Sequence, residues 1–164
     1  MKDDFDWRQF TIKIPISASP DEVFHSWTSQ ENLEKWFLRL AEFTCADGTR
    51  RKKEAQIQVG DTYKWFWHGY PDSVVEHGKI KENNEKDFLK FTFGEAGVVS
   101  VKVNPHEQGS MIELKQEKIP HFDTTEISYH VECKSGWTFY LANLKSILQG
   151  GIDLRNRDMS LNLD

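Results

Sequence analysis

The chain has 164 residues, enough for one domain with a sizeable core, and its 26 acidic and 21 basic residues give a formal net charge of -5. This charge argues against a nucleic-acid partner, because phosphate groups require a basic face. No stretch approaches the ~20 apolar residues of a membrane-spanning helix, and the acidic amino end, MKDDFDWRQF, lacks the apolar core of a secretion signal. We therefore predict a cytoplasmic protein whose two cysteines, Cys45 and Cys133, are free thiols.

The chain begins with a strand and two short helices. Apolar and polar side chains alternate over residues 10–16, which predicts a half-buried strand, and Pro15 places that strand at the edge of a sheet. Ser19-Pro20-Asp21-Glu22 combines a capping serine, a proline at the first helical position and a glutamate three residues after the cap. This capping box predicts the first helix, and a second box at Thr28–Glu31 predicts the next.

The middle of the chain has the pattern of a strand meander. A strand over residues 42–46 is followed by Asp47-Gly48, a hairpin signal. Further strands are predicted over residues 61–68, 74–81, 88–93, 98–103 and 111–117. Apolar residues recur at every second position in the later strands, as in an antiparallel sheet with one solvated face.

Residues 136–151, GWTFYLANLKSILQGG, predict a long helix near the carboxyl end. One apolar stripe is formed by Trp137, Leu141, Leu144 and Leu148. Tyr140 widens the stripe, Asn143 is predicted to face away from it, and Gly150 can end the helix. Residues 124–131 predict a separate helical turn before it. A helix of this kind laid across a curved antiparallel sheet buries both apolar faces, which indicates an α+β fold.

This order of elements resembles the START-like (SRPBCC) superfamily, with its helix-grip fold, and within it the activator of heat-shock protein 90 ATPase homologue family. The similar stretches are ISASPDEVFHSWTSQENLEKWF (16–37), VGDTYKW (59–65) and GWTFYLANLKSILQGG (136–151). The resemblance implies a curved antiparallel β-sheet wrapped around a long C-terminal helix, with two short helices after the first strand. We predict that residues 1–158 form a single START-like domain and that residues 159–164 form a flexible C-terminal tail.

The resemblance also implies a cavity between the sheet and the long helix, which in many relatives takes an apolar small molecule. We therefore expect non-catalytic binding of a hydrophobic small molecule or lipid. Two alternatives remain open: a chaperone-associated cofactor and a polyketide cyclase-like enzyme. The eukaryotic activators carry an additional amino-terminal domain that engages the chaperone. This sequence departs from that pattern, because its first predicted strand begins at Phe10.

The candidate cavity residues are mostly aromatic: Trp36, Phe37, Tyr63, Trp65, Trp67, His68, Phe91, Phe93, Gln116, Trp137, Tyr140, Leu141 and Leu144. The aromatic residues either fill the core beneath the helix or line a pocket, in which Tyr63, His68 and Gln116 would be polar anchors. The six histidines show no HxxxH or HxH spacing, and the serines lack the GxSxG signature. We predict no metal site, no cofactor and no catalytic residue.

Overall fold

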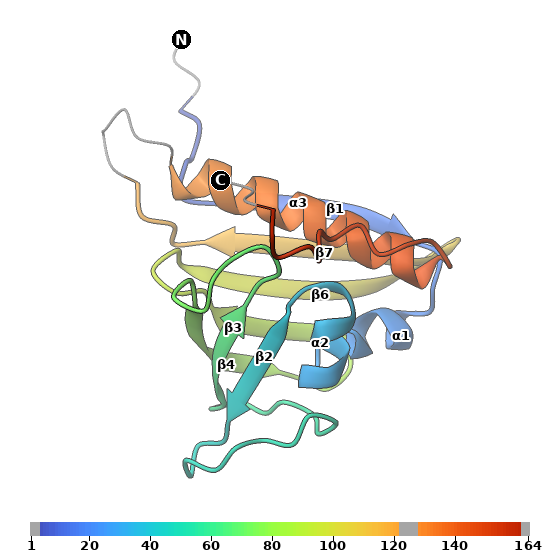
Figure 1. Cartoon of the computed structure of the whole chain (residues 1–164). Coiled ribbons are helices and arrows are strands. Elements are labelled where there is room, and N and C mark those ends of the chain that lie inside the picture. Colours follow the sequence, from blue (N-terminus) through green and yellow to red (C-terminus); the bar gives the residue numbers. More distant parts are fainter. Residues whose placement is uncertain (1–3, 122–127, 162–164) are drawn as a thin grey trace.

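The computed structural model of the chain describes residues 4–121 and 128–161. These residues form seven strands and three helices (Figure 1). The first part of the chain contains β1 (Phe10–Ile16), α1 (Pro20–His25) and α2 (Gln30–Trp36). The meander and the long helix follow as β2 (Leu40–Thr44), β3 (Thr62–Phe66), β4 (Glu76–Asn83), β5 (Phe88–Thr92), β6 (Val98–His106), β7 (Gly109–Glu117) and α3 (Tyr129–Leu148).

The strands form one antiparallel sheet in the order β1-β7-β6-β5-β4-β3-β2. β1 lies at one edge, where the missing N–H of Pro15 is tolerated. The sheet curves around α3 (Figure 1), while α1 packs on β6 and β7 and α2 packs on β2 and α3. The predicted α+β architecture, with a curved antiparallel sheet around a long C-terminal helix and two short helices after the first strand, is confirmed.

Each of the two short helices begins after a serine whose side chain accepts a hydrogen bond from a backbone N–H of the first turn. Ser19 Oγ accepts a hydrogen bond from the Glu22 N–H at 3.2 Å, as the capping box predicts. The predicted cap of α2 was wrong by one residue, because the cap is Ser29, whose Oγ accepts from the Asn32 N–H at 3.2 Å. The Thr28 hydroxyl donates back to a carbonyl of the preceding turn instead, and so does not cap α2.

The long helix begins earlier than its apolar stripe suggests. α3 starts at Tyr129 with Ser128 as its cap and continues through Gly136. The prediction of a separate helical turn over residues 124–131 is therefore wrong for residues 129–131, and residues 124–127 lie outside the described part of the chain. A glycine inside a helix costs only about 1 kcal/mol relative to alanine, which the packing of a 20-residue helix easily offsets.

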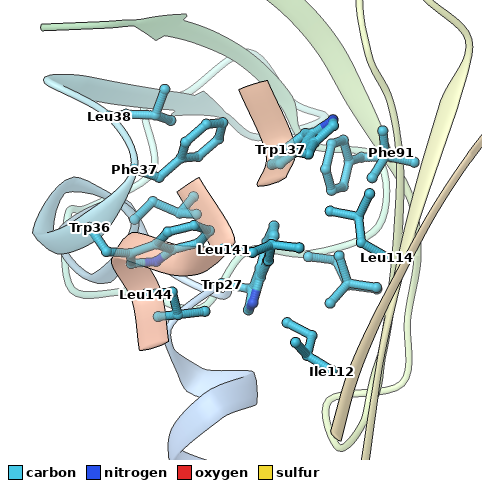
Figure 2. Close-up of a cluster of buried hydrophobic side chains, with 14 of the residues drawn as sticks. Trp27, Trp36, Phe37, Leu38, Phe91, Ile112, Leu114, Trp137, Leu141 and Leu144 are labelled. Carbon is cyan, nitrogen blue, oxygen red and sulfur yellow. The ribbon is translucent and has the colours of Figure 1, made fainter. Parts of the chain in front are cut away.

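The core lies between α3 and the concave face of the sheet (Figure 2). Trp137, Leu141 and Leu144 of α3 are each at most 3% exposed. Their neighbours in Figure 2 come from the sheet and from the two short helices and the segments after them: Phe91, Ile112, Leu114, Trp27, Trp36, Phe37 and Leu38. Burial of one large side chain of this kind contributes roughly 2–3 kcal/mol, so the interlocking of helix and sheet dominates the stability of the fold.

Asn143 was predicted to face away from the core, and this was wrong. It is fully buried, and its side-chain amide donates to the Trp36 carbonyl at 2.7 Å. Its Oδ1 accepts a hydrogen bond from the Leu154 N–H, also at 2.7 Å. Asn143 therefore joins α3 to the end of α2 and to the segment that follows α3, and these partners satisfy its polar groups inside the protein.

Arg155 fixes the segment after α3 to the same place. Its side chain is almost entirely buried and is paired with Asp153 at 2.8 Å. The guanidinium group also donates to three carbonyl groups at and just beyond the end of α2, those of Glu34, Lys35 and Leu38, at 3.0–3.1 Å. These carbonyl groups lack partners within the helix, so Arg155 acts as a C-terminal cap for α2.

Within residues 4–121 and 128–161, no helix has the length and apolar character needed to cross a membrane.

Candidate functional site

A hollow of about 230 Å³ opens between the first half of α3 and the segment after β3, and we call it the aromatic pocket. Six aromatic residues line it: Phe37, Trp67, Tyr70, Phe93, Trp137 and Tyr140. The rest of the wall is Val74, Glu132, Cys133 and Gly136. Pockets that enclose drug-sized ligands usually hold ~300–1,000 Å³, so the aromatic pocket fits one or two rings, or the end of a longer molecule.

Three of the rings belong to residues that directly follow the end of an element. Phe37 follows α2, Trp67 follows β3 and Phe93 follows β5. Trp65 and Phe91 lie two positions before Trp67 and Phe93, on the strands themselves, and both are buried in the core. The pocket therefore lies where the regular elements end and where the core side chains no longer fill the space.

The α3 wall consists of residues that share one face of the helix: Glu132, Cys133, Gly136, Trp137 and Tyr140. A methyl group placed on Gly136 would meet no atom within 4 Å. No close neighbour therefore requires a glycine here, and the missing side chain leaves open space at the pocket.

The Trp137 ring is held in place by buried hydrogen bonds. Its indole N–H donates to Gln116 Oε1 at 2.9 Å, and the Gln116 amide donates to the Ala96 carbonyl at 2.8 Å. Gln116 is fully buried, so these bonds replace the water it would otherwise contact. Burial raises the pKa of the nearby Cys133 thiol, although a hydrogen bond with Gln116 acts in the opposite direction.

Tyr140 adds a polar group to the pocket. Burial, and secondarily the neighbouring Tyr70, raise the pKa of Tyr140 to about 12. Its hydroxyl group therefore stays neutral near pH 7. A neutral hydroxyl can donate or accept one hydrogen bond, so Tyr140 could orient a ligand without adding charge to the wall.

A wider depression of about 860 Å³ adjoins the pocket, and we call it the polar groove. Phe93, Glu132 and Cys133 line both, so the two spaces are neighbours. The charged and titratable groups of the groove that are not shared with the pocket include Lys64, Glu76, His77 and Glu95. In the described part of the chain, no group of three His, Cys, Asp or Glu side chains is placed to hold a metal ion.

Two groove residues have pKa values raised mainly by burial. Burial raises the pKa of Glu76, whose Oε1 accepts a hydrogen bond from the His77 N–H at 3.3 Å. Burial and the charge of Glu76 raise the pKa of Tyr63 well above its ordinary value. The Tyr63 hydroxyl donates to the Thr92 carbonyl at 2.5 Å, so it is already engaged within the protein.

The candidate residues chosen from the sequence, apart from His68, fall into four places. The aromatic pocket brings together Phe37, Trp67, Phe93, Trp137 and Tyr140. Tyr63 borders the polar groove, while Trp36 and Leu144 border a different depression between α1, α2 and the end of α3. The core contains Trp65, Phe91, Leu141 and the paired Gln116.

His68 lies beside the segment that follows α3 rather than on the wall of the aromatic pocket. Burial lowers the pKa of His68, and Arg155, Arg157 and Arg39 lower it further. Arg155 and Arg157 belong to that segment, and the N–H of the next residue, Gly69, donates to Met159 Sδ at 3.4 Å. The structure thus separates His68 from the rings with which the sequence grouped it.

Sequence reasoning missed five pocket residues: Tyr70, Val74, Glu132, Cys133 and Gly136. A signal existed for Cys133, because it lies four residues before Trp137 and extends the helical stripe by one turn. Tyr70 and Val74 lie in an irregular segment between β3 and β4, where no periodic pattern indicates which side chains point inward.

The sequence matches a known protein family over residues 17–149, described as "Activator of Hsp90 ATPase homolog 1-like protein". The chain belongs to this family. The match covers most of the chain, including both short helices, the whole meander and α3 up to its end. The predicted resemblance is confirmed. No curated protein matches the sequence.

Solved structures of similar proteins share the fold. A Staphylococcus saprophyticus protein is 18% identical, with a TM-score of 0.69 over 90% of this chain and 96% of its own. A Colwellia psychrerythraea protein, solved as an Aha1 dimer, is 17% identical, with a TM-score of 0.66 over 87% of this chain and 97% of its own. A Plasmodium falciparum HSP90 activator is 19% identical, with a TM-score of 0.61 over 87% of this chain and 96% of its own. At such identities the likeness establishes the helix-grip fold alone.

Proposed function

We propose that this chain is a cytoplasmic, non-catalytic protein that binds a hydrophobic small molecule, or the end of a lipid, in the aromatic pocket. The observation that carries the proposal is a hollow lined by six aromatic residues, beside a helix position that has no side chain. A packed core gains nothing from such a hollow, because an unfilled space loses the contacts that its lining atoms would make. A ligand that fills it restores those contacts.

The size of the pocket limits the affinity it can provide alone. A single aromatic ring buries roughly 150–200 Å², which at ~25 cal/mol per Å² corresponds to about 4–5 kcal/mol before the costs of association. That corresponds to a dissociation constant of about 0.2–1 mM at best. A tighter ligand would therefore extend from the aromatic pocket into the adjoining polar groove.

The test uses N-phenyl-1-naphthylamine, a neutral probe whose fluorescence rises on burial. We expect a saturable fluorescence rise with the wild-type protein. Gly136→Leu places a side chain in the pocket from a position where the first added carbon meets no atom within 4 Å, and it should abolish the rise. Ser135→Leu, the same type of change at the exposed neighbouring position, is the matched control and should leave the rise unchanged.

Two further measurements make the test specific to the site. Native mass spectrometry of freshly purified protein should show a bound species that denaturation removes. In a Cys45→Ser background, the probe should slow alkylation of Cys133, which borders both spaces. Equal probe binding by wild type and Gly136→Leu, with both correctly folded by circular dichroism, would contradict binding in this pocket.

A chaperone-associated role is the second candidate function, and family membership favours it. Trp7, Val131 and Phe139 are each at least 40% exposed, and such apolar side chains suit a protein partner. The expected result is a changed ATPase rate when this protein is added to a heat-shock protein 90. No change at a saturating concentration would end this candidate.

A polyketide cyclase-like enzyme is the third candidate, and Glu76 is the feature that favours it. A general acid needs a raised pKa, and burial raises that of Glu76 in the polar groove. Turnover of an aromatic polyketide substrate, lost in Glu76→Gln, would support this candidate. Absence of turnover with a panel of such substrates would leave simple binding as the better account.

A further inference from the structure

We propose that the aromatic pocket selects a ligand whose buried end carries a quaternary or tertiary ammonium group. This inference rests on the proposed binding function and adds the chemical class of the group that enters the pocket. It combines two features of the wall: aromatic rings that meet at steep angles, and a single charged side chain, which is a carboxylate.

The planes of the rings around the pocket lie in more than one direction. Phe37 meets Tyr140 at 4.9 Å between ring centroids and 73° between planes, and it meets Trp67 at 6.2 Å and 77°. Phe93 and Trp137 are 5.4 Å apart and tilted by 48°. An aromatic ring carries negative charge density on its face, and a cation within ~6 Å of several such faces is attracted to each. A neutral apolar group gains no such electrostatic attraction.

The charge of the wall also favours a cation over an anion. Glu132 is the one charged residue lining the pocket in the described part of the chain. One basic side chain that contacts a wall residue is Arg39, whose Nε donates to the Trp67 carbonyl and whose Nη2 pairs with Asp72 at 2.5 Å. A second, Arg155, acts on the wall residue Tyr140 by lowering its pKa against the larger, opposite effect of burial, and it is paired with Asp153 at 2.8 Å. Both arginines are therefore already paired with carboxylates, and a carboxylate ligand entering the pocket would meet Glu132 without an unpaired cation on the wall.

The adjoining polar groove also carries more carboxylates than basic groups. Its carboxylates are Glu76, Glu95 and the shared Glu132, against one lysine, Lys64, and one histidine, His77. A cation that approaches through the groove is therefore attracted along the way, whereas an anion is not. Together with the net charge of -5, this places negative potential around the mouth of a ring-lined pocket.

The test compares two probes of equal shape that differ in charge: (4-hydroxyphenyl)trimethylammonium and its neutral counterpart 4-tert-butylphenol. Both are titrated into the wild-type protein by isothermal titration calorimetry at low salt. We expect the cation to bind at least tenfold more tightly. Glu132→Gln should reduce that preference several-fold. Glu107→Gln, which removes an exposed carboxylate in the turn between β6 and β7, controls for net charge and should change neither affinity.

Each outcome separates this inference from the proposed function. Equal affinities, or tighter binding of 4-tert-butylphenol, would overturn the ammonium preference and leave hydrophobic binding intact. A preference for the cation that Glu107→Gln reduces as much as Glu132→Gln does would mean that overall charge causes it, and would also overturn the inference. If neither probe binds at millimolar concentration while N-phenyl-1-naphthylamine does, the inference alone fails; if none of the three binds, both the inference and the proposed function fail.

Discussion

The two ends of α3 differ in the contacts that they make with the rest of the fold. At the C-terminal end, Leu144 is fully buried, and Asn143 and Arg155 pair the polar groups at the end of α2. At the N-terminal end, Gly136 leaves an opening surrounded by rings. One helix on one sheet is thus tied to its neighbours by buried hydrogen bonds at one end and lines a hollow of aromatic rings at the other. The hollow is a local feature at a few positions and does not reflect loose packing of the whole fold.

The largest expected effect concerns Trp137, which lies at the boundary between the two ends. Trp137→Ala should destabilise the protein by about 3–5 kcal/mol, because it leaves a cavity in the core and removes the partner of Gln116. Urea denaturation measures the change. Phe139→Ala, at an exposed position of the same helix, should cost about 0.5 kcal/mol or less. Similar costs for the two variants would contradict the placement of α3.

Asn143→Ala tests whether polar pairing holds the C-terminal end of α3 in place. It leaves the Trp36 carbonyl and the Leu154 N–H without their partner, so we expect a loss of about 3 kcal/mol. The control is Thr138→Ala, which removes an exposed hydroxyl bonded only within the helix. Chemical denaturation of both variants gives the comparison, and a cost below about 1 kcal/mol for Asn143→Ala would show that this end does not depend on the hydrogen bonds.

Gly78→Ala probes a glycine in the closely packed part of the sheet. An added methyl group there would lie 2.2 Å from the Thr92 carbonyl oxygen and 2.3 Å from the Tyr63 ring. We expect destabilisation of about 2 kcal/mol, since neither the backbone nor the buried ring can move freely. Thermal unfolding checks this against Lys79→Ala, an exposed neighbour that should be close to neutral.

Gly136→Ala makes the same change at the hollow end and should have the smallest effect, with the opposite sign. The added methyl group has no close neighbour, and alanine favours a helix interior over glycine by up to about 1 kcal/mol. A rise in the thermal unfolding midpoint is therefore expected. A destabilised Gly136→Ala protein would mean that the space beside this position is needed for packing.

Much of the fold could be predicted because its signals are local. The alternation in residues 10–16 and the capping box at Ser19 each depend on a few neighbouring residues. Asn143 could not be placed in this way, because its partner Trp36 is 107 residues away in the chain. A polar residue beside an apolar stripe looks solvent-exposed until the segment that covers it is known.

The candidate site was only partly predictable for a related reason. Period-two alternation groups Trp65 with Trp67, and Phe91 with Phe93, on one face of each strand. It does not say where each strand ends, yet that point separates the core residue from the pocket residue in both pairs. His68 could not be placed from the pattern either, because Arg155 and Arg157, which lower its pKa, lie in the segment after α3.

The cap that Arg155 places on α2 has a practical consequence for producing the protein. The region shared with the family ends at residue 149, six positions before this arginine. A recombinant fragment trimmed to the shared region would therefore lose the guanidinium group and expose the carbonyl groups of Glu34, Lys35 and Leu38. Expression boundaries should extend beyond Arg155.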